Sequence, residues 1–279
     1  MTHRPGERRQ IRIGERGPLV GDGAFLVIAG PCAVESHDGL MAVADAIARD
    51  GAGMLRGGAW KPRTSPHSFQ GIGAGGLELL ATARERTGLP VVTEVLDPRD
   101  VAQAAAVADV LQVGARNMAN GALLRELGRA RVPVLLKRGF GATLAELLNA
   151  SEYLLAEGNE DVFLVERGIR TFETATRFTL DIAAVPVLRD RTHLPILIDP
   201  SHAAGVARWV PDLARAAAAV GADGIMVEVH ASPADALSDG AQALTLDGFT
   251  SLVASLDPVL EAVGARRSVP VGLVSASPA

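Results

Sequence analysis

The segment Leu55–Pro66 concentrates groups that bind anions. It carries three cationic and two hydroxyl side chains: Arg56, Lys61, Arg63, Thr64 and Ser65. Its prolines push the preceding residues out of the helical region, and glycines 57 and 58 let the backbone approach a ligand closely. Guanidinium, ammonium and hydroxyl groups together suit phosphate. Taken alone, the segment is either a phosphate site or a solvated basic loop.

A second group of residues has the side chains of a metal site. They are Cys32, His202, Glu228 and Asp239. A thiolate, an imidazole and two carboxylates suit a divalent ion such as Mn, Fe, Co or Zn. No CxxC or HExxH spacing supports the set, and taken singly Cys32 could be a core thiol and His202 a structural hydrogen-bonding residue. The four residues predict a metal site only when they are taken together.

Further cations stand out because the protein is acidic, with 27 basic against 32 acidic side chains and a net charge of −5. Arg116, Lys137 and Arg167 each follow a short apolar run, as Arg56 does. Cations gathered without a ligand would repel one another, so the sequence predicts a ligand with more than one anionic group. Glu94 could hold one of these cations in place or be an ordinary surface carboxylate.

The composition bounds the class of protein. The chain has 279 residues, of which 48% are hydrophobic, 21% charged and only 4% aromatic, as expected for a globular protein with an aliphatic core. The charge gives no sign of nucleic-acid binding. Neither a membrane span nor a secretory signal is predicted, and the single cysteine excludes an internal disulfide. We therefore expect a cytoplasmic protein that binds neither nucleic acid nor membrane.

Short apolar runs alternate with longer Ala- and Leu-rich stretches along the chain. The predicted strands are 25–29, 53–55, 91–95, 110–113, 132–136, 162–165, 196–198 and 224–227. The predicted helices are 40–49, 77–86, 100–108, 121–130, 144–156, 174–188, 206–220, 234–243 and 246–263. Eight strands separated by helices predict an α/β protein with a single (β/α)8 TIM barrel, and the alternative is a doubly wound sheet.

The barrel is expected over residues 25–263. Residues 1–24 form an N-terminal extension in which 10–13 and 19–20 could pair as a hairpin, and 264–279 form a flexible tail. In such a barrel the carboxyl ends of all strands meet at one mouth, where active sites of this fold lie. Every predicted strand is followed by a charged, thiol or imidazole group, including Asp199 after the seventh strand. The sequence therefore predicts a functional mouth.

Several motifs of the sequence closely resemble 3-deoxy-D-arabino-heptulosonate 7-phosphate (DAHP) synthases of the type I beta class. These motifs are AGPCAVES (29–36), LRGGAWKPRTSP (55–66), QVGARNM (112–118), LKRG (136–139), DPSH (199–202), and VEVH (227–230) followed by ALSDG (236–240). The resemblance covers about residues 10–263 and implies a (β/α)8 barrel. It also implies that the chain condenses phosphoenolpyruvate with erythrose 4-phosphate, as a 3-deoxy-7-phosphoheptulonate synthase in the shikimate route to aromatic amino acids.

The resemblance implies a role for each candidate residue. Cys32, His202, Glu228 and Asp239 would bind a divalent metal. Phosphoenolpyruvate would be bound by Arg56, Lys61, Glu94, Ala115, Arg116, Lys137 and Arg167, and Asp199 is assigned to the substrate site. Arg63, Thr64 and Ser65 would contact erythrose 4-phosphate. Lys61, Cys32 and His202 are the catalytic candidates, with Lys61 as a proton donor whose pKa neighbouring cations should lower.

The alternatives are a 3-deoxy-octulosonate 8-phosphate synthase, which would use arabinose 5-phosphate, and a non-catalytic phosphate-binding barrel. The Lys61-Pro-Arg-Thr64 motif favours the four-carbon aldose, and Cys32 favours the metal-dependent form. The resemblance further implies a homodimer or homotetramer and allows a separate chorismate mutase as partner. Since no regulatory domain is recognised in the sequence, weak inhibition by aromatic amino acids is expected.

Overall fold

A computed structural model describes residues 7–63 and 65–273. Eight parallel strands form a closed barrel: β3 (Ala24–Gly30), β4 (Met54–Arg56), β5 (Val91–Glu94), β6 (Val110–Val113), β7 (Val134–Lys137), β8 (Val162–Glu166), β9 (Ile196–Ile198) and β10 (Gly224–Glu228). Each strand pairs with the next along the chain, and β10 closes the barrel by pairing with β3, with Glu228 opposite Gly30. The predicted (β/α)8 barrel is confirmed, and the doubly wound alternative is excluded because its sheet would have open edges.

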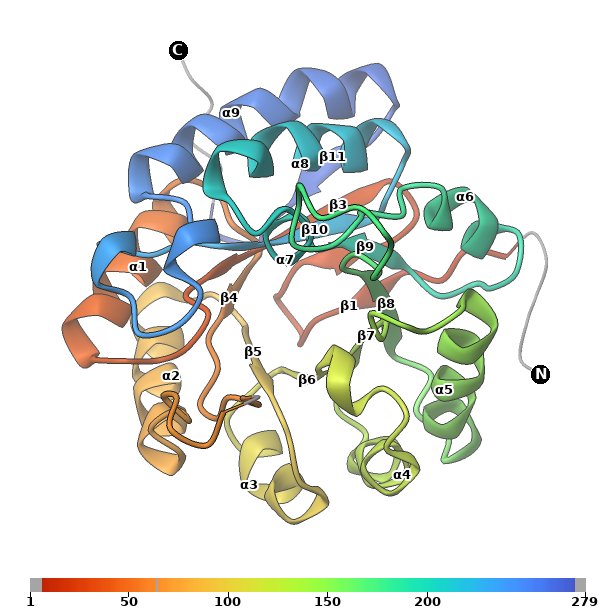
Figure 1. The fold of residues 1–279 in the computed structure, drawn as a ribbon, viewed down its shortest axis with the longest axis horizontal. Coiled ribbons are helices and arrows are strands. Elements are labelled where there is room, and N and C mark those ends of the chain that lie inside the picture. The colour runs from red at the N-terminus through yellow and green to blue at the C-terminus, as the bar shows by residue number, and fades with distance from the viewer. Residues whose placement is uncertain (1–6, 64, 274–279) are drawn as a thin grey trace.

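Helices surround the strands, as Figure 1 shows. They are α1 (His37–Arg49), α2 (Ala74–Thr87), α3 (Val101–Ala105), α4 (Gly121–Ala130), α5 (Leu144–Ala156), α6 (Ala184–Arg189), α7 (Pro200–Ala204), α8 (Val210–Ala219) and α9 (Leu246–Ala262). Short 3-10 turns are η1 (Pro98–Asp100), η2 (Ala115–Asn117), η3 (Ala207–Trp209), η4 (Pro233–Asp235) and η5 (Gly240–Gln242). Within the described ranges, no helix combines the length and apolar character needed to cross a membrane.

The core has two layers because successive side chains of a strand point to opposite faces. On β3, Phe25 and Val27 pack outward against the helices, whereas Leu26 and Ile28 fill the barrel interior. Buried residues from the other strands, such as Phe163, complete the inner layer. The barrel interior below the mouth is therefore filled by apolar side chains.

The N-terminal hairpin plugs the barrel at the end opposite the mouth. Strands β1 (Ile11–Arg12) and β2 (Leu19–Val20) pair antiparallel, with Ile11 opposite Val20, and both side chains join the inner layer. The predicted hairpin therefore forms. The expectation of a flexible tail fails in part, because β11 (Arg266–Ser268) adds a parallel strand to β3. Residues 1–6 and 274–279 lie outside the described residues.

Two predicted helices are wrong in ways that matter for the site. Most of 174–188 is an irregular loop, and only α6 is helical; side chains in the loop bond nearby backbone, as when Thr176 Oγ1 donates to the Phe178 carbonyl. The stretch 234–243 forms η4 and η5 instead of a helix, with the non-glycine residue Asp239 in the left-handed region at φ 55°. Both stretches pass close to the barrel mouth.

Candidate active site

The strand ends surround a cavity of about 270 Å³. It is lined by Arg56, Lys61, Pro62, Arg63, Ser65, Ser68, Glu94, Gln112, Gly114, Ala115, Arg116, Lys137, Arg167, Arg177, His202 and Asp239. Most of the residues predicted for substrate binding are in this list. The structure therefore brings the predicted anion-binding residues together with two of the predicted metal ligands.

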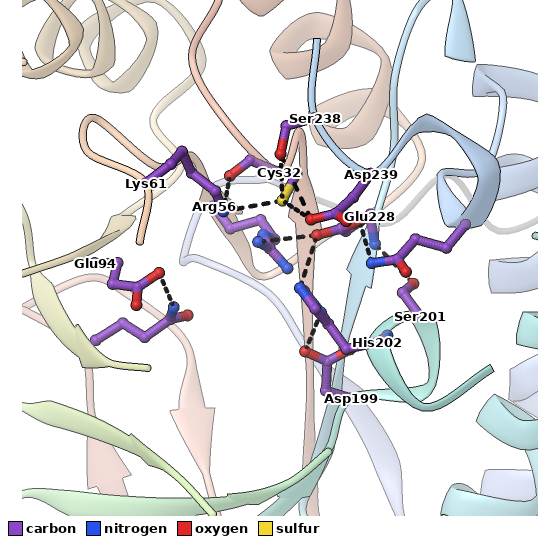
Figure 2. A network of polar contacts seen from close by, with 12 residues as sticks. Cys32, Arg56, Lys61, Glu94, Asp199, Ser201, His202, Glu228, Ser238 and Asp239 are labelled. Atoms are coloured by element: carbon purple, nitrogen blue, oxygen red, sulfur yellow. Dashed lines mark hydrogen bonds and ion pairs between the residues drawn. The ribbon is translucent and has the colours of Figure 1, made fainter. Parts of the chain in front are cut away.

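The four predicted metal ligands form one cluster at the edge of this cavity. One donor atom from each of Cys32, His202, Glu228 and Asp239 lies within 4.8 Å of the others (Figure 2). Cys32 Sγ is 3.0 Å from Asp239 Oδ2, and His202 Nε2 is 3.3 Å from Glu228 Oε1. Glu228 Oε1 is buried and accepts no hydrogen bond from any described residue, as expected of an oxygen that faces a cation. The residues therefore fit a divalent transition metal.

His202 is oriented by the local sequence Asp-Pro-Ser-His. Asp199 is the N-cap of α7 and accepts from the His202 N–H at 2.9 Å, while Pro200 occupies the first turn. Asp199 Oδ2 also lies 2.8 Å from His202 Nδ1, which leaves Nε2 to point at Glu228. This carboxylate–histidine arrangement is typical behind metal-binding histidines.

Asp199 was predicted to belong to the substrate site, but it lies behind the residues that line the cavity. It is fully buried, does not line the cavity, and forms an ion pair with Lys137. Burial acts against its charge, but His202 and Lys137 hold the pKa of Asp199 well below its usual range. Burial also lowers the pKa of Lys137, although Asp199 opposes this effect. Asp199 therefore holds two cavity residues in place from below.

Lys61 lies directly beside the metal cluster. Its Nζ donates to Cys32 Sγ at 3.0 Å and to the Cys32 carbonyl at 3.1 Å. Burial and Arg56 act to lower the pKa of Lys61, but Cys32, Glu94 and Glu228 outweigh them and raise it. The expectation that neighbouring cations would lower this pKa is therefore wrong, because the effect of the surrounding acidic groups is larger than that of Arg56 and burial.

The Cys32 thiol is the other unusual titrating group. Burial, with a further contribution from Glu228, raises the pKa of Cys32 to about 12, against the opposing effect of Lys61 and Arg56. The thiol donates to Asp239 Oδ2 in this state. His202 behaves differently, since burial lowers its pKa despite Asp199 and Glu228. Near neutral pH the cluster therefore contains a neutral imidazole and a protonated thiol.

Two buried arginines that line the cavity each have a donor atom without a partner among the described residues. Arg56 is 4% exposed and Arg167 is 5% exposed, yet the Nη1 atom of each has no hydrogen-bond partner among the described residues. Burial lowers the pKa of Arg167. Arg56 Nη2 is 3.3 Å from Glu228 Oε1, so this arginine joins the cation group to the metal cluster. Buried guanidinium N–H groups without partners are expected where an anionic ligand completes the site.

The opposite wall of the cavity holds Glu94 and the turn after β6. Glu94 is 7% exposed, and its Oε2 accepts from Gln112 Nε2 at 3.3 Å. A Cβ at Gly114 would lie 1.9 Å from Glu94 Oε1, so a side chain there would displace the Glu94 carboxylate. The turn continues into η2, which places Ala115 and Arg116 on the cavity wall.

The loop after β4 lies at the mouth. Arg63 and Ser65 line the cavity, and Arg63 Nη1 donates to Ser238 Oγ at 2.8 Å. Thr64 lies outside the described residues. The basic segment is thus part of the cavity wall, with Arg63 half-buried and Ser65 exposed to solvent.

Sequence reasoning missed some residues of the site. Arg177 and Gln112 line the cavity, and Gln242 bonds Glu228, but none was predicted. Arg177 and Gln242 lie in the two stretches expected to be helical. Arg138, which follows the fifth strand, does not line the cavity and pairs with Glu166 and Asp181.

Comparisons with known proteins agree with this geometry. The profile of the DAHP synthetase I family matches residues 9–262. The phospho-2-dehydro-3-deoxyheptonate aldolase of Thermotoga maritima is 51% identical over 247 residues, which are 88% of this chain and 73% of that protein. A solved truncated form of 3-deoxy-D-arabino-heptulosonate 7-phosphate synthase from the same organism is similar with a TM-score of 0.87 at 46% identity, covering 94% of this chain and 95% of that one.

A more distant similarity is to the 2-dehydro-3-deoxyphosphooctonate aldolase of Nitratidesulfovibrio vulgaris. That protein is 35% identical over 248 residues, which are 82% of this chain and 90% of the relative. The large difference in identity favours the heptonate enzymes. The chain therefore belongs to the DAHP synthetase I family and has the DAHP synthase activity of that family.

Proposed function

We propose that this cavity carries out a metal-dependent condensation of phosphoenolpyruvate with erythrose 4-phosphate, giving DAHP and inorganic phosphate at the start of the shikimate route. The observation that carries the proposal is the direct contact between two kinds of site. A cluster of four potential metal ligands adjoins a group of buried cations in one cavity, and Arg56 and Lys61 contact both. A metal-activated aldehyde and a doubly anionic substrate would meet there.

Phosphoenolpyruvate carries a phosphate and a carboxylate, and the cavity offers enough donors for both. Arg56, Lys137, Arg167 and Arg116 all line the cavity, and the first three are buried. The unpartnered Nη1 atoms of Arg56 and Arg167 gain hydrogen bonds when the anion binds. The Ala115 N–H would add a neutral donor. Fixing both ends of the substrate orients its C3 toward the second substrate.

Arg63 and Ser65, with Thr64, would bind the phosphate of erythrose 4-phosphate at the outer end of the cavity. This binding places the aldehyde near the metal cluster. The proposed metal ligands are Cys32, His202, Glu228 and Asp239, and the ion is Mn, Fe, Co or Zn. When bound, the metal acts as a Lewis acid on the aldehyde oxygen.

Lys61 is the proposed proton donor. Its raised pKa keeps it protonated at neutral pH, and it lies beside the cluster where the aldehyde would bind. C3 of phosphoenolpyruvate forms a bond to the aldehyde carbon while Lys61 delivers a proton to the aldehyde oxygen. Water then adds at C2, and the C–O bond to phosphate breaks to release inorganic phosphate.

The decisive assay measures phosphate release from phosphoenolpyruvate with erythrose 4-phosphate or arabinose 5-phosphate, with and without chelator and added Mn²⁺. We expect activity with erythrose 4-phosphate that chelator abolishes and Mn²⁺ restores. A preference for arabinose 5-phosphate would establish the octulosonate alternative, which the more distant relatives represent. Full activity in chelator would overturn the metal assignment, and no phosphate release with either aldose would favour a binding protein.

The family resemblance supports further proposals on assembly and location. We infer a homodimer or homotetramer in the cytoplasm, with a separate chorismate mutase as the candidate regulatory partner. Light scattering of the purified protein gives the oligomeric state. Mixing with chorismate mutase tests for complex formation.

A further inference from the structure

Arg177 and Gln242 form a connected set of hydrogen bonds behind the proposed metal ligands. Arg177 Nη1 donates to Asp239 Oδ1 at 3.0 Å and to Gln242 Oε1 at 2.8 Å. Gln242 Nε2 donates in turn to Glu228 Oε2 at 2.7 Å. Guanidinium groups only donate and carboxylates only accept, so these partners fix the orientation of the Gln242 amide. One arginine thereby contacts both carboxylate ligands, directly or through one amide.

In each of the two carboxylates, the two oxygens have different partners. Asp239 Oδ1 is held by Arg177, while Oδ2 faces Cys32. Glu228 Oε2 is held by Gln242, while Oε1 lies 3.3 Å from His202 Nε2 and has no hydrogen-bond partner among the described residues. In both ligands, one oxygen is fixed from behind and the other points into the cluster. Such outer contacts orient metal ligands before the ion arrives.

The backbone holds this network against the helix that carries His202. The Arg177 and Phe178 N–H groups donate to the carbonyls of Ala204 and Ala203 at 3.2 and 2.9 Å. The Arg177 guanidinium lies 5.9 Å from the centre of the Phe178 ring, and Arg167 lies over the same ring at 4.2 Å. Gln242 is 2% exposed, so its amide cannot exchange its partners for water without local opening. The loop is therefore attached to α7 and shares an aromatic ring with the anion site.

Asp239 has the greatest need for such support. Its backbone lies in the left-handed region, which L side chains rarely adopt, and it belongs to the short turn before η5. No helix or barrel strand fixes this residue, unlike Glu228 at the end of β10. The Arg177 contact replaces that missing support.

We propose that Arg177 and Gln242 are positioning residues that preorganise Asp239 and Glu228 for the metal ion. The inference rests on the metal site proposed above. Since the residues act through the ligands, their loss should weaken metal binding much more than it weakens folding. Arg177 also brings positive charge near the ion, so the net benefit of its contact is expected to be smaller than that of Gln242.

The test measures Mn²⁺ affinity by competition with a chelating dye, in the apo protein and without substrate. Gln242→Leu should weaken binding by about 10- to 100-fold and Arg177→Met by about 10-fold. Arg177→Lys should recover part of the loss, because it keeps a donor toward Asp239. Since both residues belong to one network, the double variant should lose less than the product of the single effects.

Arg170→Met is the matched control. Arg170 lies on the same loop and stacks on Phe140 at 4.8 Å, but it does not line the cavity. This variant should bind Mn²⁺ as the wild type does. If the wild type itself binds no metal, the proposed metal site fails. If the wild type binds Mn²⁺ and Gln242→Leu binds it equally well while only its melting temperature falls, Gln242 and Arg177 are structural and the inference is overturned.

Discussion

At the scale of single residues, the site depends on charged groups that are kept almost entirely out of water. Lys137, Arg56 and Lys61 are 4 to 7% exposed, and each has an acidic partner as well as cationic neighbours. Burying such groups is costly unless they are paired, so the acids stabilise the unliganded cavity. Donors left without partners then remain for the substrate anions.

Arg63→Ala tests the separation of the two phosphate sites. Arg63 bonds Ser238 at the outer wall and makes no contact with Lys137 or Arg167 that the structure records. The variant should raise the KM for erythrose 4-phosphate by about 10- to 100-fold, the usual loss for a charge-assisted hydrogen bond, with a much smaller effect on phosphoenolpyruvate. Steady-state kinetics with each substrate varied in turn gives both values. Equal changes in the two KM values would contradict the assignment.

Metal affinity should rise steeply with pH. The Cys32 pKa of about 12 means that the thiol must lose a proton when it binds a metal at neutral pH, whereas the lowered pKa of His202 makes it already neutral. Each rise of one pH unit lowers proton competition tenfold, so the Kd for Mn²⁺ should fall by about tenfold per unit between roughly pH 7 and 9.

Dye competition at each pH measures this slope, and calorimetry in buffers of different ionisation enthalpy counts the released proton. Cys32→Asp is the control, since an ordinary carboxylate is already ionised in this range and the slope should vanish. A wild-type Kd that does not change with pH would show that Cys32 is not a ligand.

Residue identity was more predictable from the sequence than residue environment. Cations after apolar runs could be assigned to a barrel mouth because strand ends must converge. The raised pKa of Lys61 could not be foreseen, since it depends on how close Cys32 and Glu94 lie in space. Gln242 gave no signal, because an amide has no charge or metal-ligand character in a sequence.

At the scale of elements, the strands fix one part of the site and irregular loops the other. Glu228 and Lys137 end barrel strands, whereas Arg177 and Asp239 lie in loops held by side-chain contacts. The strands were predictable because short apolar runs alternate with longer Ala- and Leu-rich stretches along the chain. The loops were not, because Ala- and Leu-containing stretches resemble helices until the local hydrogen bonds of Thr176 and the left-handed backbone of Asp239 are known.

Gly205→Ala should show how α7 and the loop before α6 depend on each other. Gly205 caps α7 with φ +72°, and a Cβ there would lie 2.5 Å from Arg177 Cβ. The substitution should push the loop away from Asp239. We expect a loss of about 1–2 kcal/mol in unfolding free energy from the strained backbone, together with at least tenfold weaker Mn²⁺ binding.

Gly88→Ala is the matched control, because Gly88 caps α2 at φ +71° with nothing within 4 Å of the added Cβ. It should show a similar loss of stability by urea unfolding, with kcat/KM and Mn²⁺ affinity unchanged. If both variants bind Mn²⁺ like the wild type, the loop does not depend on close packing at Gly205.

At the scale of the whole molecule, stability and chemistry occupy opposite ends of the barrel. The hairpin side chains join the inner layer near the starts of the strands, where the Arg9 N–H donates to the His193 carbonyl and Gly17 lies against Pro90. The cavity lies at the strand carboxyl ends. Changes at the hairpin should therefore alter folding and leave catalysis intact.

Ile13→Ala tests this separation. Ile13 is 1% exposed, and its truncation should lower the unfolding free energy by about 2–4 kcal/mol with no change in kcat. Val271 is 67% exposed, so Val271→Ala should change the unfolding free energy by less than about 0.5 kcal/mol. Urea unfolding and steady-state kinetics on the same preparations give both quantities. A fall in kcat for folded Ile13→Ala would show that the two ends are coupled.

The buried cations also have a consequence for the end of each catalytic cycle. Guanidinium and ammonium groups that attract a substrate phosphate from solution hold a product phosphate in the same place. Inorganic phosphate should therefore inhibit competitively against phosphoenolpyruvate, and rising ionic strength should weaken both substrate capture and this inhibition. Departure of phosphate would then limit turnover at low salt, and a burst in the first cycle, seen by rapid mixing, would reveal it.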